Sequence, residues 1–161
     1  MIRLTALIIL FQLSNILFSQ TLWLGEWVGE WEAKYKLNEE NIYEHLLIKE
    51  THNRTFVKME INGGQLDDTI LEFKFSTELF LTVDLDKQEI AGFYIDDHGF
   101  NGMMYVKGKI TNENEFIFEG SCPLWTNKMT WKLEDGKLNR KNIIKTYDTE
   151  ITNEVSFIKK N

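Results

Sequence analysis

The stretch from Leu24 to Leu37 alternates between two kinds of side chain, and this alternation restricts the fold more than any other feature of the sequence. Every second position from Trp27 to Leu37 is aromatic, aliphatic or small, whereas the positions between them are Val28 and four charged residues. A period of two residues is typical of a β-strand with one face toward solvent. We therefore expect a strand whose ring-bearing face is covered by the rest of the chain.

The same period recurs in short segments that are separated by turn residues. The expected strands cover residues 42–49, 55–61, 69–75, 79–85, 89–95, 103–110, 115–121, 128–134, 138–147 and 154–159. Asn62-Gly63-Gly64 and Asp135-Gly136 have the composition of tight hairpin turns. No window after the N-terminal segment keeps the 3.6-residue period of a helix, so we expect at most a short helical turn near residues 21–24.

Consecutive strands with one apolar face each can satisfy their edges by closing into a barrel or by pairing into a sandwich. A sandwich usually contains Greek-key crossovers and therefore some long connections, whereas almost every connection here is short. The sequence therefore favours an up-and-down antiparallel β-barrel of about ten strands over a sandwich.

Residues 1–19 have the character of a secretory signal peptide. They carry one basic residue, Arg3, no acidic residue, and an apolar run that ends at Ser19. A membrane anchor is the alternative, although Gln12 and other polar residues interrupt the run, which is short for a bilayer. We expect a secreted or periplasmic protein with a single domain, residues 20–161, and no membrane insertion after signal cleavage.

Composition restricts the partners and the sources of stability. The formal net charge is −7, so nothing favours binding to a nucleic-acid backbone or an anionic membrane. Cys122 is the only cysteine and cannot form a disulfide within the chain. Stability is therefore expected to come from the core. The sequence also leaves a homodimer as a possible partner state.

Gly25-Glu26-Trp27 at the head of the first strand resembles the Gly-x-Trp signature of the lipocalin and calycin superfamily. Gly29 extends it to Gly-x-Trp-x-Gly, which is similar to nitrobindin-like and fatty-acid-binding-protein-like barrels. Trp31 departs from the nitrobindin-like pattern, which has a further glycine there.

A later stretch is similar to secreted bacterial lipocalin-like proteins of unknown function. The residues that carry this similarity are Gly92-Phe93-Tyr94-Ile95-Asp96, His98-Gly99, Tyr105 and Gly108. The resemblance implies a lipocalin-like barrel with a ligand in its interior.

The resemblance also bears on haem and on Arg140. Nitrobindin-like proteins hold haem through a histidine close to the C-terminus, and no histidine follows His98 here, so haem is disfavoured and no cofactor is expected. In lipocalins a late arginine packs over the signature tryptophan, and Arg140 is the matching candidate for a cover over Trp27. The similarity to fatty-acid-binding proteins implies instead that Arg140 grips a ligand carboxylate bidentately.

The side chains expected to face the interior include flat rings and adaptable methionines, which suit a pocket for a small hydrophobic or aromatic molecule. Gly29, Ala33 and Gly108 would leave concave space beside them. The candidate ligand-binding residues are Trp31, Tyr35, Met59, Phe73, Phe75, Met104, Phe118, Met129, Trp131 and Arg140. The alternative is a filled barrel that acts as a protein interaction or assembly module, and an open interior of several hundred Å³ would distinguish the two.

Enzymatic chemistry finds little support in the sequence. Asp96-Asp97-His98 places carboxylates beside an imidazole, but in a glycine-flanked turn where such residues are expected for backbone reasons. Asp84-Leu85-Asp86 lacks the full ligand pattern of a calcium loop. No catalytic residue and no metal site is assigned, and a calycin-type enzyme is a weaker alternative than a binding protein.

Overall fold

A computed structural model gives the fold of the chain. It describes residues 25–37, 39–51, 56–67, 70–71, 75–84, 86–97 and 103–160. The expected signal peptide, the expected helical turn at 21–24, Phe73 and His98 lie outside the described residues. No helix with the length and apolar character needed to span a bilayer occurs in the part of the chain that the structure describes.

The described chain consists of antiparallel β-strands joined in sequence order. The strands are β1 (Gly29–Leu37), β2 (Glu40–Thr51), β3 (Phe56–Asp67), β4 (Ile70–Leu71), β5 (Phe75–Asp84), β6 (Glu89–Asp96), β7 (Met103–Asn112), β8 (Glu115–Ser121), β9 (Thr126–Glu134), β10 (Lys137–Lys145) and β11 (Glu150–Lys159).

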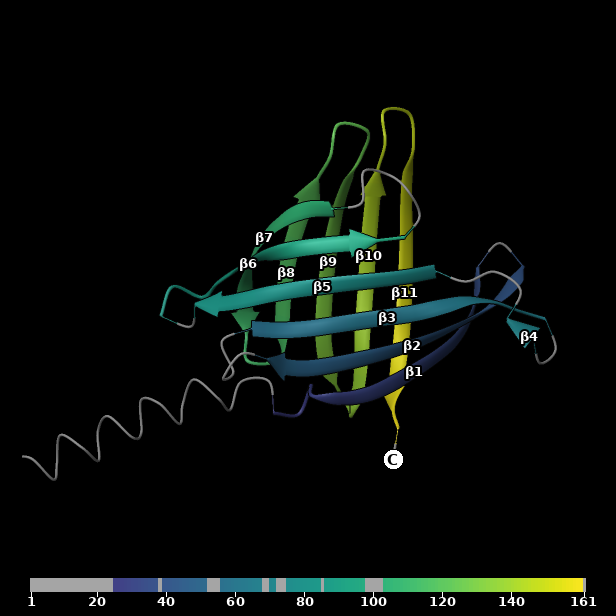
Figure 1. The fold of residues 1–161 in the computed structure, drawn as a ribbon, viewed down its shortest axis with the longest axis horizontal. Coiled ribbons are helices and arrows are strands. Elements are labelled where there is room, and N and C mark those ends of the chain that lie inside the picture. The colour runs from purple at the N-terminus through teal and green to yellow at the C-terminus, as the bar shows by residue number, and fades with distance from the viewer. Residues whose placement is uncertain are drawn as a thin grey trace, which may run out of the picture.

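The sheet closes on itself. β1 pairs with β11 at one side and with β2 at the other, and the additional pairing of β2 with β3 joins the two ends of the strand order. Ten strands form the closed up-and-down barrel, and the short β4 pairs only with β3. In Figure 1 the strands β2, β3, β5 and β6 run across the front at a steep angle to β8–β11 behind them. The expected all-β up-and-down barrel is confirmed.

Two local expectations have different outcomes. The Asp135-Gly136 turn is confirmed, because both residues have positive φ values, 53° and 71°, between β9 and β10. The turn expected at residues 62–64 is wrong, since Gly63 and Gly64 lie inside β3, and Gly63 pairs with Glu44 on β2 and Phe75 on β5. A Cβ atom at Gly63 would lie 2.9 Å from the Glu44 Cγ and 2.8 Å from the Phe75 ring. The glycine is therefore needed for close approach and not for a turn.

The strand expected at residues 69–75 lies largely outside the described residues, which include 70, 71 and 75 of this range. Phe75 begins β5, which runs without interruption to Asp84, and the described residues before it form only the two-residue β4. The expected strand at 79–85 is thus the second part of one longer strand, whose inward residues continue the alternation of Phe75, Thr77 and Leu79.

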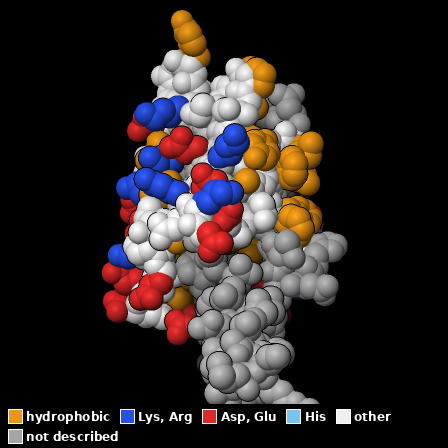
Figure 2. Space-filling model, turned by 90° about the vertical axis from the view of Figure 1, so that its left-hand side faces the viewer, with side chains coloured by type: hydrophobic (Ala, Val, Ile, Leu, Met, Phe, Trp, Pro, Cys, Tyr) orange, Lys and Arg blue, Asp and Glu red, His pale blue; other side chains and the backbone are white. Residues whose placement is uncertain are grey.

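The outer surface of the barrel carries a strip of apolar side chains on β5, β6 and β7. Phe80, Phe93 and Tyr105 are directly opposite one another on β5, β6 and β7, and the Phe93 and Tyr105 ring centroids are 5.7 Å apart. Met103 is 62% exposed beside them. Figure 2 shows hydrophobic side chains gathered along one flank of the molecule, next to a flank of mixed Lys, Asp and Glu.

Candidate ligand-binding site

The barrel interior is hollow at the end where β1 turns into β2 and β10 turns into β11. The hollow has a volume of about 740 Å³ and opens to solvent. Its walls come from nearly every barrel strand and from the connection between β8 and β9. The lining residues are Tyr35, Leu37, Glu40, Ile42, Glu44, Ile61, Gln65, Phe75, Thr77, Tyr94, Asp96, Leu124, Trp125, Asn127, Met129, Arg140, Asn142, Ile144, Thr146 and Asn153.

The floor of this cavity is a buried ion pair between β2 and β10. The Arg140 Nη1 donates to the Glu44 Oε2 at 2.7 Å, and the Arg140 Nη2 donates to the Glu44 Oε1 at 2.8 Å. The two side chains are only 5% and 1% exposed. Because each ion satisfies the other bidentately, two charges can be accommodated inside the barrel.

Tyr35 completes the floor. Its hydroxyl donates a hydrogen bond to the Glu44 Oε1, so this carboxylate accepts bonds from both Tyr35 and Arg140. Burial, together with the negative charge of Glu44, raises the pKa of Tyr35. The phenol therefore stays protonated and serves as a fixed donor.

Arg140 also separates the cavity from the rings below it. Its guanidinium carbon lies 5.8 Å from the Trp131 ring centroid and 5.4 Å from the Phe157 centroid. Burial alone would lower the pKa of Arg140, but the charge and hydrogen bonds of Glu44 outweigh it and raise the pKa. Among the described residues, the rings beneath the guanidinium are Trp131 and Phe157, and not the Trp27 ring that the resemblance places there.

The wall opposite the ion pair contains a second tyrosine. Burial raises the pKa of Tyr94 to about 12, a hydrogen bond from Thr77 opposes the rise, and the charge of Asp96 adds to it. The Tyr94 ring also meets the Trp125 ring edge-on, with centroids 6.4 Å apart. These side chains give the cavity a mixed aromatic and polar surface.

Asparagine amides supply further polar groups of the cavity. Asn127 is 4% exposed, and the Oδ1 atoms of Asn127 and Asn142 have no hydrogen-bond partner among the described residues. A buried acceptor without a donor costs free energy. These amides are therefore groups that a guest molecule could satisfy.

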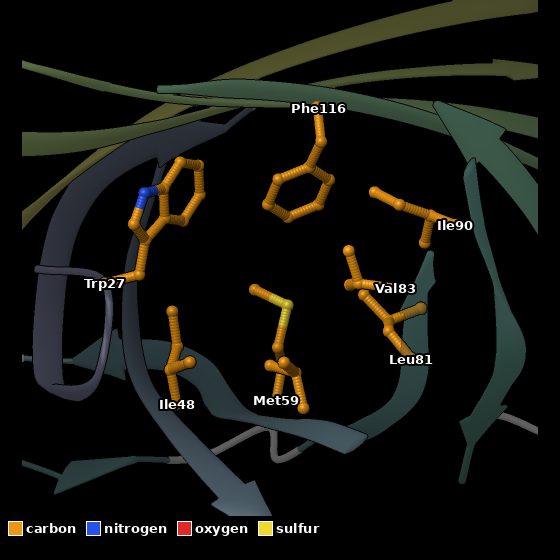
Figure 3. Close-up of a pocket in the computed structure, with 8 residues that line it drawn as sticks. Trp27, Ile48, Met59, Leu81, Val83, Ile90 and Phe116 are labelled. Carbon is orange, nitrogen blue, oxygen red and sulfur yellow. The ribbon is translucent and has the colours of Figure 1, made fainter. Parts of the chain in front are cut away.

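The opposite end of the barrel is filled. Trp27 is 1% exposed and its ring lies 4.9 Å from the Phe116 ring, while the Trp31 Nε1 donates to the Trp27 carbonyl at 2.9 Å. In Figure 3 the side chains of Trp27, Ile48, Met59, Leu81, Val83, Ile90 and Phe116 point toward one another. They leave an apolar void of only about 10 Å³, which is too small for a ligand.

The expected site residues are divided between these two halves. Tyr35, Phe75, Met129 and Arg140 line the cavity. Met59 borders the small void, and Phe73 lies outside the described residues. The other four are buried in the packed interior: Trp31, Met104, Phe118 and Trp131.

The three small residues that were expected to leave concave space for a ligand have other roles in the structure. Gly29 has a φ of +136°, and a Cβ there would lie 3.0 Å from the Lys159 side chain, at the filled end of the barrel. A Cβ at Gly108 would lie 2.0 Å from the Ile117 carbonyl oxygen, so this glycine permits close strand approach. Neither residue borders the large cavity, and Ala33 is buried in the core.

Sequence reasoning missed the acidic partner of Arg140. Glu44 alternates with Ile42, Leu46 and Ile48 along β2, which was the available signal that its side chain faces inward. Tyr94, Thr77 and the asparagines carried no signal of their own, because polar residues are common on both faces of partly exposed strands.

The acidic stretches to which the sequence analysis assigned no chemistry have structural partners in the described part of the chain. Within the described ranges, no group of three His, Cys, Asp or Glu side chains could hold a metal ion. Asp96 lines the cavity, whereas the Asp97 Oδ1 accepts a hydrogen bond from the Ser76 amide. Asp84 bonds the Lys87 amide and ammonium within its turn.

The closed antiparallel barrel is compatible with a lipocalin-like or calycin-like fold. Neither a protein-family model nor a curated protein sequence matches this chain.

Proposed function

We propose that this protein binds a small hydrophobic or aromatic molecule in the open half of the barrel. The observation that carries the proposal is the cavity of about 740 Å³ above the Glu44–Arg140 pair, a volume in the range of small-molecule sites. Its surface combines apolar side chains such as Phe75, Ile61 and Met129 with amides, hydroxyls and charges, and convergent polar groups of this kind orient the ligand in small-molecule sites.

The proposal includes a location outside the cytoplasm and a place in the lipocalin and calycin superfamily. The location rests on the apolar residues 1–19 of the sequence. Superfamily membership rests on the Gly-x-Trp signature, since Trp27 ends a turn just ahead of β1 and packs at the filled end of the barrel.

A titration with the neutral fluorescent probe N-phenyl-1-naphthylamine tests the binding function. We expect saturable binding with a rise in fluorescence, because the probe leaves water for an apolar cavity. Ile144→Trp should abolish it, since Ile144 lines the cavity on β10 and a bulky ring would occupy the space.

The matched control is Ile143→Trp, one residue along β10 and outside the cavity lining. This variant should bind the probe as the unchanged protein does. Binding that survives Ile144→Trp, in a variant that unfolds at the same temperature, would place the site elsewhere on the molecule.

A second candidate function is a protein interaction module, and the outer strip of Phe80, Phe93 and Tyr105 favours it. Sedimentation velocity would reveal self-association through this strip as a homodimer. Tyr105→Glu should return such a dimer to monomer without unfolding, because Tyr105 is 50% exposed. A monomer at all concentrations would remove self-association from consideration.

A further inference from the structure

We propose that the ligand carries an uncharged hydrogen-bonding head, a hydroxyl or a carboxamide, and that the cavity discriminates against carboxylates. This inference rests on the proposed binding function and specifies the chemistry of the ligand. It contradicts the alternative in which Arg140 binds the carboxylate of a ligand.

Arg140 is already committed to an internal carboxylate. Both of its terminal nitrogens donate to Glu44, and the Tyr35 hydroxyl donates to the same carboxylate. A ligand carboxylate could take these donors only by displacing Glu44. The displaced Glu44, now 1% exposed, would become a buried charge without a partner, which is strongly unfavourable.

The charge of the lining also opposes an anion. Among the described lining residues, the carboxylates are Glu40, Glu44 and Asp96, against the single guanidinium of Arg140. Once Glu44 and Arg140 neutralise each other, the remaining charges are negative. A second negative charge on the ligand would therefore meet repulsion in a partly desolvated space.

Two neutral amides are left for a ligand head, beside the Arg140 Nε, which also has no hydrogen-bond partner among the described residues and can donate to the oxygen of a hydroxyl or a carboxamide. The Oδ1 atoms of Asn127 and Asn142 have no partner among the described residues, and both side chains line the cavity. The terminal torsion of an asparagine is soft, so a small rotation aims its unpartnered oxygen at a guest. A hydroxyl or a carboxamide can donate to these oxygens, whereas an ionised carboxylate can only accept.

The body of the ligand is apolar. Ile61, Phe75 and Met129 line the same cavity as the two amides, so a molecule can place its head on Asn127 and Asn142 while its body contacts hydrocarbon. The unpartnered amides supply specificity, because they are satisfied only by a guest with a matching head.

Competition against bound N-phenyl-1-naphthylamine tests this chemistry with four molecules of equal chain length. Decanol, decanamide, decanoate and decylammonium are compared at about pH 8, where decanoate is ionised. We expect the two neutral molecules to displace the probe at least about tenfold more tightly than decanoate. If decanoate displaces the probe as tightly as the neutral molecules or more tightly, the inference is overturned while the binding function stands. The same holds if decylammonium is the tightest competitor. A complete lack of probe binding overturns both.

Glu44→Gln supplies an independent test, because it frees the guanidinium of Arg140 for a ligand. In this variant the affinity for decanoate relative to decanol should rise about tenfold or more. Glu119→Gln is the matched control on the outer surface of β8 and should leave the ratio unchanged. An unchanged ratio in folded Glu44→Gln would overturn the internal neutralisation of Arg140, and if that variant does not fold, the four-molecule comparison decides alone.

Discussion

The two halves of the barrel interior share their strands but differ in what their side chains do. In the filled half, rings and aliphatic side chains around Trp27 and Met59 leave about 10 Å³. In the open half, the same strands surround about 740 Å³ with a mixture of rings, amides and charges. The difference indicates that one half stabilises the barrel, which leaves the other half free to keep unsatisfied groups.

The boundary between the halves is the pair of Glu44 and Arg140. Below the guanidinium lies a row of rings that runs from Phe157 through Trp131 and Phe116 to Trp27, with successive centroids 6.0, 6.5 and 4.9 Å apart. Above it lie the cavity and Asn142. A buried ion pair between β2 and β10 also links strands that the hydrogen-bond ladders do not join directly.

Replacing one tryptophan in each half gives the sharpest test of this comparison. Trp27→Ala should lower the free energy of unfolding by about 3–5 kcal/mol, because it empties a packed site. Trp125→Ala, at the partly exposed wall of the cavity, should cost less than about 2 kcal/mol. Urea denaturation measures both, and equal losses would show that the halves do not differ in their contribution to stability.

The boundary itself is tested by removing one ion and then both. Arg140→Met should cost about 3 kcal/mol, since Glu44 stays buried with Tyr35 as its remaining donor. The double variant Glu44→Leu and Arg140→Met should recover most of this loss, because no buried charge is left. Thermal unfolding of the two variants measures the recovery, and a double variant less stable than the single one would contradict this account.

The sequence predicts a feature well when neighbouring residues determine it, and poorly when residues far apart in the chain determine it. The alternation in residues 27–37 and the Asp135-Gly136 turn act locally, and both led to the observed strands. The turn predicted at Gly63 is wrong because this glycine is required by residues on two other strands. Glu44 and Phe75 need the space that a side chain at position 63 would occupy.

The division of the interior depends on register, which local alternation does not determine. Met59 and Met129 both face inward, yet Met59 borders the small void and Met129 the cavity. Likewise, the contact of Glu44 with Arg140 joins residues 96 positions apart. Both facts follow from how the closed sheet staggers its strands, which a single strand's pattern does not reveal.

The polar half should make stability sensitive to alkaline pH. The fold raises the pKa of Tyr94 from 10.0 to about 12, so it favours the neutral phenol. This contribution is fully present below about pH 10 and is lost as the pH rises through about 12. Tyr94→Phe should therefore lose less stability than the unchanged protein over this range, by on the order of 1–2 kcal/mol.

Chemical denaturation at a series of pH values measures the difference, and Tyr147→Phe is the control. Tyr147 is fully exposed on the β10–β11 connection, so its variant should follow the unchanged protein at every pH. A Tyr94→Phe curve that coincides with the control would show that Tyr94 has no part in the alkaline loss.

The smallest expected effect concerns the unsatisfied amides. Asn127→Leu should leave stability unchanged or raise it by up to about 1 kcal/mol, because it removes a buried acceptor that has no partner. Asn139→Leu, on the outer face of β10, removes an acceptor bonded to the Ser156 hydroxyl at 2.6 Å and should lower stability by about 0.5 kcal/mol. Differential scanning calorimetry compares the two variants. The opposite signs would show that the open half keeps a polar group at the expense of stability, as a binding site does, whereas a clear loss for Asn127→Leu would mean that this amide stabilises the empty barrel.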